Sequence, residues 1–245
     1  MRYFCRVEYV GTEYAGWQIQ NKHDSIQSEL ERAFSLVSRK PCKVVGAGRT
    51  DTGVHAKGQG MHIDLPLLEN PKNFVNSINS VLPNDIAIYN FQEVVDTFHA
   101  RYSAIERCYK FYLIETKKPL WNNRAYHITF PINWNIVTRN IPYLIGTHDF
   151  TSFCASGSST KSKICTVNSA NLEKKNGTIY IFTIRANRFV YKMVRSIMGT
   201  LLDIGRGKIT ESLNTIINSK NRAIVGQTAP PHGLVLDYVT YLEVL

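Results

Sequence analysis

The feature that most restricts the fold is the order in which two hydrophobic periodicities follow each other along the first half of the chain. Apolar and polar residues alternate over residues 2–10, which is typical of a half-buried strand. From residue 26 to residue 37 the apolar side chains recur at helical spacing instead. Asp24 stands where a helix cap is expected, and Gln27 stands where its capping-box partner would lie. The sequence therefore begins with a strand followed by an amphipathic helix.

The remainder of this half continues the alternation. Short apolar runs at 43–45 and 61–65 predict two strands joined by a Gly-rich segment. Asn70-Pro71 then predicts the start of a second helix, and residues 86–89 predict a further strand. The resulting order, β-α-β-β-α-β, is the ferredoxin-like pattern.

The second half repeats this theme with longer insertions. Asn176-Gly177 is a strong hairpin signal between two alternating runs. We therefore predict an α+β protein with two ferredoxin-like halves, residues 1–103 and 104–245, and a cleft between them where a ligand would bind. The predicted elements of the second half are a strand, the two strands of the hairpin, a helix and a closing strand, at residues 107–115, 166–173, 178–186, 190–203 and 234–245.

Charge is unevenly distributed between these halves. Residues 1–103 carry 11 basic and 11 acidic side chains, whereas residues 104–245 carry 18 basic and 8 acidic ones. The whole net charge of +10 therefore lies in the second half. Such an excess indicates a polyanionic partner, although a solvated basic surface is the plainer interpretation.

Several protein classes do not fit the sequence. The five cysteines are odd in number and include no CxxC pair, so a disulfide framework and a zinc ribbon are not expected. Arg6 and Glu8 interrupt the first apolar run, which is unlike a signal peptide, and no apolar run approaches the ~18 residues of a membrane span. We expect a cytoplasmic protein that does not enter a membrane.

The segment from Gly46 to Ala56 is the strongest candidate for chemistry. Its three glycines predict a loop in which the backbone turns tightly or is approached closely. Their spacing matches neither a dinucleotide fingerprint nor a P-loop. The loop carries Asp51 near Arg49, with His55 four residues beyond the acid. A structural aspartate in a turn and a catalytic aspartate both remain open on this evidence.

Other chemistries lack their signatures. No HExxH motif or other zinc-ligand spacing is present, no G-x-S-x-G elbow occurs, and no pair of carboxylates suggests glycoside hydrolysis. We therefore expect no metal and no cofactor. The remaining possibility is a reaction served by one carboxylate, basic side chains and aromatic rings.

Five blocks of the sequence resemble the tRNA pseudouridine synthase A family (the TruA family), and they follow the family's order across nearly the whole chain. The segments at 9–18 and 229–234 match as well. Thr52 replaces a frequent alanine, and residues 57–61 vary the segment after His55. The five blocks are residues 46–56, 98–104, 107–111, 146–153 and 189–201.

The resemblance implies isomerisation of uridine to pseudouridine at positions 38, 39 and 40 of the tRNA anticodon stem-loop. It also implies that the two halves join into one continuous, mainly antiparallel sheet with helices on one face, that the protein is a homodimer, and that no cofactor is needed. Carried over by position, Asp51 is the nucleophile and Arg49 helps to extract the base. Tyr109 packs on the uracil, and Arg195 pairs with Asp51.

The matching blocks hold further candidates for RNA binding or base flipping, namely Arg101, His148, Asp149 and Lys192. Leu234, or alternatively Leu236, is expected to contact the base. Phosphate contacts are expected from four basic residues of the second half, Lys161, Lys163, Arg188 and Lys192.

Each assignment has a plainer alternative. Tyr109 on an alternating strand would ordinarily be a packing aromatic, Arg195 a surface arginine and Asp149 a helix cap. His55 and His99 are expected to be structural. For the whole chain, a non-catalytic tRNA-binding module and a base-removing, glycosidase-like enzyme are the alternatives to a synthase.

Overall fold

The computed structural model describes residues 1–20, 23–157, 160–242 and 244, and the chain divides into two compact units. Unit 1 comprises Met1–Arg107 and Val235–Leu245, and unit 2 comprises Cys108–Leu234. Both units combine helices with mostly antiparallel strands, so the predicted α+β class is confirmed.

Unit 1 has the predicted β-α-β-β-α-β order. Strands β1 and β3 pair antiparallel, β4 pairs antiparallel with the other edge of β1, and β2 pairs antiparallel with β3. This arrangement of four strands is that of a ferredoxin-like sheet. The elements are β1 (Arg2–Tyr9), α1 (Ile26–Ser38), β2 (Val44–Gly46), β3 (His55–Asp64), α2 (Pro71–Val81) and β4 (Ile86–Val94).

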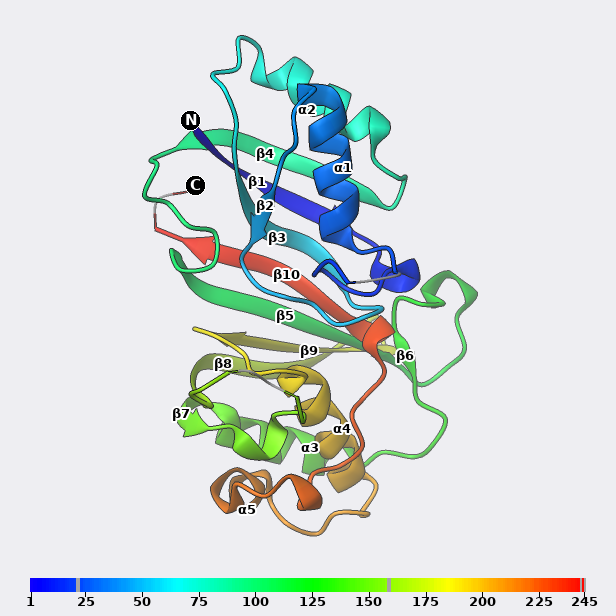
Figure 1. Cartoon of the computed structure of the whole chain (residues 1–245). Helices are drawn as coiled ribbons and strands as arrows, with labels where there is room; N and C mark the ends of the chain where they lie inside the picture. The colour runs from blue at the N-terminus through cyan, green and yellow to red at the C-terminus, as the bar shows by residue number, and fades with distance from the viewer. Residues whose placement is uncertain (21–22, 158–159, 243, 245) are drawn as a thin grey trace. The chain divides into compact units, whose positions relative to one another are not determined.

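Aromatic side chains join the two helices of unit 1 to its sheet. Phe34 of α1 lies 6.1 Å from Phe74 of α2, measured between ring centroids, and Phe74 lies 6.0 Å from Phe91 of β4. Phe91 in turn stacks at 5.0 Å on Tyr3 of β1. Helices α1 and α2 therefore lie side by side over one face of the sheet, as Figure 1 shows.

The start of α1 corrects the predicted cap. Ser25, in extended conformation and fully buried, accepts a hydrogen bond from the Ser28 amide, and the Ser28 side chain accepts one from the Ser25 amide. The capping box thus lies one residue after Asp24. Gln27 has another role, because its amide group donates to the Glu31 carboxylate at 2.9 Å.

Strand β3 is longer than the 61–65 run that the sequence predicts. Gly58 and Gly60 give its first half the composition of a loop, yet both are required by close packing. A Cβ atom on Gly60 would lie 2.2 Å from the Tyr241 hydroxyl, and one on Gly58 would lie 2.9 Å from the Asp237 carbonyl. The glycines therefore let the C-terminal strand approach β3.

This strand, β10 (Leu234–Tyr241), corrects the predicted domain boundary at 104–245. Val235 and Leu236 pair in parallel with His55 and Ala56 of β3, beyond the part of its edge that β2 occupies. Residues 235–245 therefore group with unit 1, and the first boundary moves from 103 to 107. Residues 243 and 245 of the predicted closing strand lie outside the described residues.

Unit 2 keeps the predicted strand, hairpin and helix. Asn176 and Gly177 both have positive φ, at 47° and 70°, as a two-residue hairpin turn of type I′ requires. The sheet order is β5-β9-β8-β7, with β6 beside β5. The elements are β5 (Ala104–Ile114, which belongs to this unit from Cys108 onward), β6 (Tyr126–His127), α3 (Trp134–Asn140), β7 (Gly146–Asp149), β8 (Ile164–Lys175), β9 (Ile179–Ala186), α4 (Met193–Gly205) and α5 (Leu213–Ser219).

Each unit encloses its own apolar core. Phe4, Phe34 and Phe98 are fully buried in unit 1, and Phe111 and Phe182 are fully buried in unit 2. In the described part of the chain, every helix lacks the length or the hydrophobicity needed to cross a lipid bilayer.

A buried histidine lies at the centre of unit 1. His62 of β3 is 4% exposed, and its Nδ1 accepts a hydrogen bond from the Ala100 amide at 3.1 Å. Burial lowers the pKa of His62 to about 4, and the nearby charges of Arg2 and His99 act in the same direction. The folded protein therefore holds His62 neutral well below the ordinary pKa of histidine.

This burial predicts a loss of stability in acid. Between pH 6.5 and pH 4 the unfolded chain binds a proton at His62 that the folded chain excludes, so stability falls as the pH is lowered through this window. His62→Asn retains an acceptor for the Ala100 amide but cannot titrate. Between pH 7 and about pH 4.5, we expect the decrease in the free energy of unfolding to be about 2 kcal/mol smaller in this variant than in the wild type. Urea unfolding at several pH values measures this difference, and parallel curves for the two proteins would contradict it.

Candidate active site

The loop that carries Asp51 ends in a tight turn. The Asp51 carbonyl accepts a hydrogen bond from the Val54 amide at 3.1 Å, and Gly53, the third residue of the turn, has φ of 75°. A positive φ at that position is what a type II turn requires, and glycine adopts it without steric cost. Thr52 is exposed at the second position, where most residues are tolerated, so its departure from the family's frequent alanine leaves the turn intact.

The backbone of residues 11–17 holds this loop from one side. The Trp17 amide donates to the Thr50 carbonyl at 3.2 Å, and the Gly53 amide donates to the Tyr14 carbonyl at 3.4 Å. Gly16, at φ +94°, lies so close that a Cβ atom would be 2.4 Å from the Thr50 carbonyl oxygen. A side chain at this position would therefore displace the residue immediately before Asp51.

Buried side chains fix the two ends of the turn. The Thr50 hydroxyl lies 2.8 Å from the Tyr9 hydroxyl, in hydrogen-bond contact. His55 is 6% exposed, and its Nδ1 accepts from the Gly11 amide at 3.0 Å. These contacts agree with the structural role expected for His55. Asp51 itself is half-buried between these anchored positions.

Arg49 lies on the exposed part of the same loop. Its Nε donates to the Gln18 side chain at 3.1 Å, which ties it to the segment that follows Trp17. The fully buried Gln59 donates to the Gly48 carbonyl at 2.9 Å and fixes the preceding residue. Gln18 and Gln59 are supporting residues to which the sequence assigned no role, although Gln18 ends the matching segment 9–18.

Tyr109 of β5 belongs to unit 2 and is half-buried. Its ring meets that of Phe189 edge to face, with 5.1 Å between the centroids. The geometry is a favourable aromatic pair, so Phe189 orients the Tyr109 ring. The sequence placed Phe189 in a matching block but assigned it no role.

Arg195 lies on the first turn of α4, and the main chain of Ala229 holds it. Its Nε donates to the Ala229 carbonyl at 2.9 Å, and the Ala229 amide donates to the Arg195 carbonyl at 3.0 Å. The helix starts at Met193 rather than at residue 190, because Lys192 adopts a left-handed conformation with φ of 60°. Such a conformation in a residue other than glycine is uncommon and costs about 1 kcal/mol or more.

The remaining candidates in unit 2 have local partners. Asp149 accepts from the Thr151 hydroxyl at 2.6 Å and from the Thr151 amide at 3.0 Å, and the Lys220 ammonium lies 3.3 Å away. The bond from the Thr151 hydroxyl is the main cause that lowers the pKa of Asp149. His148 donates from Nε2 to the Ile145 carbonyl at 2.9 Å. These contacts are those of a structured turn, and the predicted role of this pair in RNA binding stays a prediction.

The other residues predicted from sequence differ in exposure. Leu234 and Leu236 are both buried, at 5% and 2% exposed. Arg101 and Lys161 are exposed, whereas Lys163 donates to the Thr160 carbonyl at 2.6 Å. Arg188 and Lys192 are half-buried, and the Lys192 ammonium lies 5.1 Å from the centroid of the Tyr191 ring.

Asp51 and Arg49 belong to unit 1, whereas Tyr109 and Arg195 belong to unit 2. The predicted pairing of Asp51 with Arg195, the continuous sheet and the central cleft all concern how the units meet, so they stay predictions. Within residues 1–20, 23–157, 160–242 and 244, no group of three or more His, Cys, Asp or Glu side chains is placed to hold a metal ion.

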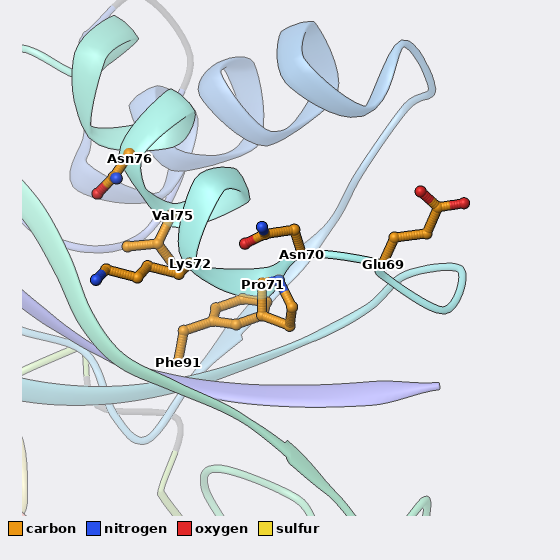
Figure 2. A pocket seen from close by; sticks show the side chains of 7 residues that line it. All are labelled: Glu69, Asn70, Pro71, Lys72, Val75, Asn76 and Phe91. Atoms are coloured by element: carbon orange, nitrogen blue, oxygen red, sulfur yellow. The ribbon is translucent and has the colours of Figure 1, made fainter.

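Two recesses on the surface lie away from the residues predicted for the site. Figure 2 shows one of ≈ 520 Å³ at the start of α2, where Pro71 lies next to the Phe91 ring and the charged ends of Glu69 and Lys72 point in opposite directions. A second, of ≈ 620 Å³, is lined by Pro131–Asn135, Gly205 and Arg206. Neither of these two recesses is lined by a residue predicted for the site.

The packing around Arg195 predicts the effect of one added methyl group. A Cβ atom on Gly199 of α4 would lie 1.7 Å from the Gln227 carbonyl oxygen, two residues before Ala229. Helix propensity alone would make Gly199→Ala stabilising, but the clash forces the 227–229 segment away from the helix. We expect Gly199→Ala to lower the free energy of unfolding by about 1–3 kcal/mol and to weaken the hydrogen bonds between Ala229 and Arg195.

Thermal and urea unfolding measure this effect, and Gly48→Ala is the matched control. A Cβ atom on Gly48 meets nothing within 4 Å. A Gly199→Ala protein as stable as the wild type would show that the segment is not fixed by this contact.

Comparison with known proteins agrees with this arrangement of motifs. The family model described as tRNA pseudouridine synthase matches residues 6–103 and 141–242. Among solved structures, the chain is similar to a chain of a Cbf5-Nop10-Gar1 complex. The match has 9% sequence identity and covers 81% of this chain and 54% of that chain. Its TM-score is 0.35, which is too low to bear on the fold.

Curated relatives match over almost their whole length. The tRNA pseudouridine synthase A of Anoxybacillus flavithermus is 39% identical over 97% of this chain and 97% of its own. That of a Thermoanaerobacter species is 43% identical over 96% of this chain and 97% of its own. The chain therefore belongs to the tRNA pseudouridine synthase family.

Proposed function

We propose that the protein converts uridine to pseudouridine at positions 38, 39 and 40 of the tRNA anticodon stem-loop, with Asp51 as the nucleophile. The observation that carries this proposal is the Asp51 turn. A half-buried carboxylate sits on a backbone held by residues 11–17, inside a region that matches the family model. Membership of the family supports an isomerase that acts on tRNA.

The reaction suits a single carboxylate. The bond from N1 of uracil to C1′ of ribose breaks, the base rotates, and a bond from C5 to C1′ forms. The C5 proton is lost to solvent and N1 takes up a proton from solvent, so that the product is an isomer of the substrate. No electrons are gained or lost overall, so no redox cofactor is required. Asp51 would form a covalent bond to the ribose or to the base and release it when the C5 bond has formed.

The other residues proposed for the site either help the target base to leave its stack or balance the charge of Asp51. The target uridine must leave its stack, which costs a few kcal/mol and is offset by contacts in the site. Arg49, exposed next to Asp51 and tied to Gln18, is suited to fill the vacated position in the RNA. Tyr109, supported by Phe189, provides a ring for the uracil to stack on.

Arg195 is proposed to pair with Asp51, so that its guanidinium balances the negative charge of the carboxylate. The bond from its Nε to the Ala229 carbonyl sets the plane of the guanidinium, and this plane directs the Nη groups. In this proposal the units meet so that those groups face Asp51, and Leu234 lines the space for the base.

We further propose that the protein acts as a cytoplasmic homodimer without a cofactor. All five cysteines are buried as thiols rather than joined in disulfides, which suits a reducing compartment. The dimer follows from the family resemblance. Binding of tRNA draws on the positive charge of residues 104–245, and Arg101, which precedes this range, adds a further exposed cation.

Replacing the proposed nucleophile tests the chemistry. Asp51→Asn keeps the size and the hydrogen bonds of the turn but removes the nucleophile, so tritium release from C5-labelled uridine in tRNA should fall by at least about a thousandfold. Asp24→Asn, an exposed aspartate in the same unit, is the matched control. Near-normal release by Asp51→Asn would overturn the role of Asp51.

The same assay separates the alternatives. A tRNA-binding module would bind tRNA without any tritium release by the wild type, and a base-removing enzyme would yield free uracil. Mapping pseudouridine in tRNA from cells that lack the protein then tests positions 38, 39 and 40.

Salt dependence tests the proposed phosphate contacts. Each contact contributes about −0.7 to −0.9 to the slope of log K against log salt concentration. Lys161→Gln removes an exposed charge, and Lys163→Gln removes one in the same segment. We expect each to reduce the slope by about this amount, measured by fluorescence anisotropy with a tRNA transcript. Lys57→Gln, an exposed lysine of unit 1, is the control, and an unchanged slope in the two unit 2 variants would contradict the assignment.

A further inference from the structure

An exposed aromatic ring stands on a short turn in unit 1, outside the residues assigned to the reaction. Tyr102 is 76% exposed, although large aromatic side chains are usually buried where they have no other role. The turn runs from Phe98 to Ser103, between β4 and β5.

The turn is rigid because one histidine organises it. The Nδ1 atom of His99 accepts from the amides of Arg101 and Tyr102, at 3.1 and 3.4 Å. The Ser103 amide donates to the His99 carbonyl at 2.8 Å, and the Ser103 hydroxyl accepts from the His99 amide at 3.0 Å. The turn is therefore already ordered before any ligand binds.

Buried groups anchor the turn to the core of unit 1. Phe98 is fully buried, and its carbonyl accepts from Arg2 at 2.8 Å. The Tyr241 hydroxyl donates to the Ala100 carbonyl at 2.8 Å, and the ring of His62 lies 4.9 Å from that of His99. The exposed ring thus rests on a layer of fixed side chains.

Tyr102 has an aromatic partner and a cation beside it. The His99 ring packs against the Tyr102 ring with centroids 4.3 Å apart, and the Arg101 guanidinium lies 5.7 Å from the Tyr102 centroid. An aromatic ring open to solvent next to an arginine is the arrangement with which proteins stack single-stranded bases and hold the adjoining phosphate.

We propose that Tyr102 is a stacking platform for an unpaired base of the tRNA that flanks the target uridine, with Arg101 contacting the phosphate beside it. This proposal rests on tRNA being the substrate, as the proposed function has it. Because His99 already orders the turn, little conformational entropy is lost when the base binds.

Arg107 links the platform to the loop that carries Asp51. Its Nη2 donates to the Arg101 carbonyl at 2.7 Å and to the Ala47 carbonyl at 3.3 Å. One guanidinium thus joins residues 98–103 to residues 46–56. A base held on Tyr102 is therefore kept in a constant position relative to Asp51.

The test measures tRNA affinity in an Asp51→Asn background, where no turnover occurs. Stacking on an aromatic ring is lost in Tyr102→Ala, and we expect the Kd for an unmodified tRNA transcript to rise about tenfold. Tyr102→Phe keeps the ring and should restore the affinity to within about twofold. Leu67→Ala, which removes an equally exposed apolar side chain of unit 1, is the control for a general surface effect.

The salt slope separates the two residues of the platform. Tyr102→Ala should leave the slope of log K against log salt unchanged, whereas Arg101→Gln should reduce it by about 0.7. A Kd for Tyr102→Ala within twofold of the Asp51→Asn parent, in a protein with native unfolding behaviour, would overturn the proposal. The proposal would also be overturned if Tyr102→Ala changed the oligomeric mass in sedimentation but left the affinity for tRNA unchanged. The ring would then be a contact between chains.

These results are independent of the proposed chemistry. If Asp51→Asn retained activity, the nucleophile would be wrong while the platform could still be tested by affinity, now with tRNA already modified. If the wild type bound no tRNA at all, both proposals would fail together.

Discussion

The proposed active site depends first on the close approach of two main-chain segments in unit 1. Residues 11–17 lie against residues 50–54 so tightly that neither Gly11 nor Gly16 could carry a side chain without striking the opposite backbone. The contact supplies hydrogen bonds to amides and carbonyls that a Gly-rich loop would otherwise leave to water. It converts a flexible segment into a defined turn, and it places the Asp51 carboxylate at a position that main-chain geometry sets.

Unit 2 uses the same principle for Arg195. Here the chain of residues 226–229 passes directly over α4, because Gly199 leaves room for the Gln227 carbonyl. The two hydrogen bonds between Arg195 and Ala229 follow from that approach. In both units, then, glycine at a contact between backbones determines where a charged side chain is held. The proposed reaction draws on both charged groups, so each unit prepares one part of the chemistry.

The proposed recognition of RNA involves a different kind of residue. The groups suited to contact tRNA are exposed rings and cations on short, internally bonded turns, as in the segment around His99 and Tyr102. Their order comes from local hydrogen bonds and from a few buried anchors, such as Phe98 and the Tyr241 hydroxyl. Such turns can present a ring to solvent at a small entropic cost, which a flexible loop could not do.

The parts of the fold that sequence predicted well are those in which local periodicity and tertiary packing agree. The amphipathic pattern located α1 and α2, and Asn176-Gly177 located the hairpin, since only residues that tolerate positive φ fit such a turn. The cap of α1 was misplaced by one residue because Asp24 and Ser25 are both good caps. Only the burial of Ser25 distinguishes them.

The parts of the structure that the sequence did not predict depend on contacts between distant segments. Half of β3 was not predicted, because Gly58 and Gly60, which make room for Asp237 and Tyr241 of β10, look like loop residues in the sequence. The short helices α3 and α5, at seven residues each, are too brief for a helical period to stand out. Gln18, Gln59 and Phe189 support the candidate site residues through contacts that the sequence does not specify, even though Gln18 and Phe189 lie in matching segments.

By itself, the sequence determined the α+β class, the order of elements in unit 1, the excess of positive charge after residue 103 and the motifs that identify the family. These properties depend on residue type and short-range spacing, which can be read along the chain. Tertiary structure alone decided that the C-terminal strand joins β3, that the Asp51 turn rests on residues 11–17, and that Ala229 holds Arg195. Each of those contacts joins residues more than 30 positions apart, and no local preference specifies which distant backbone will be the partner.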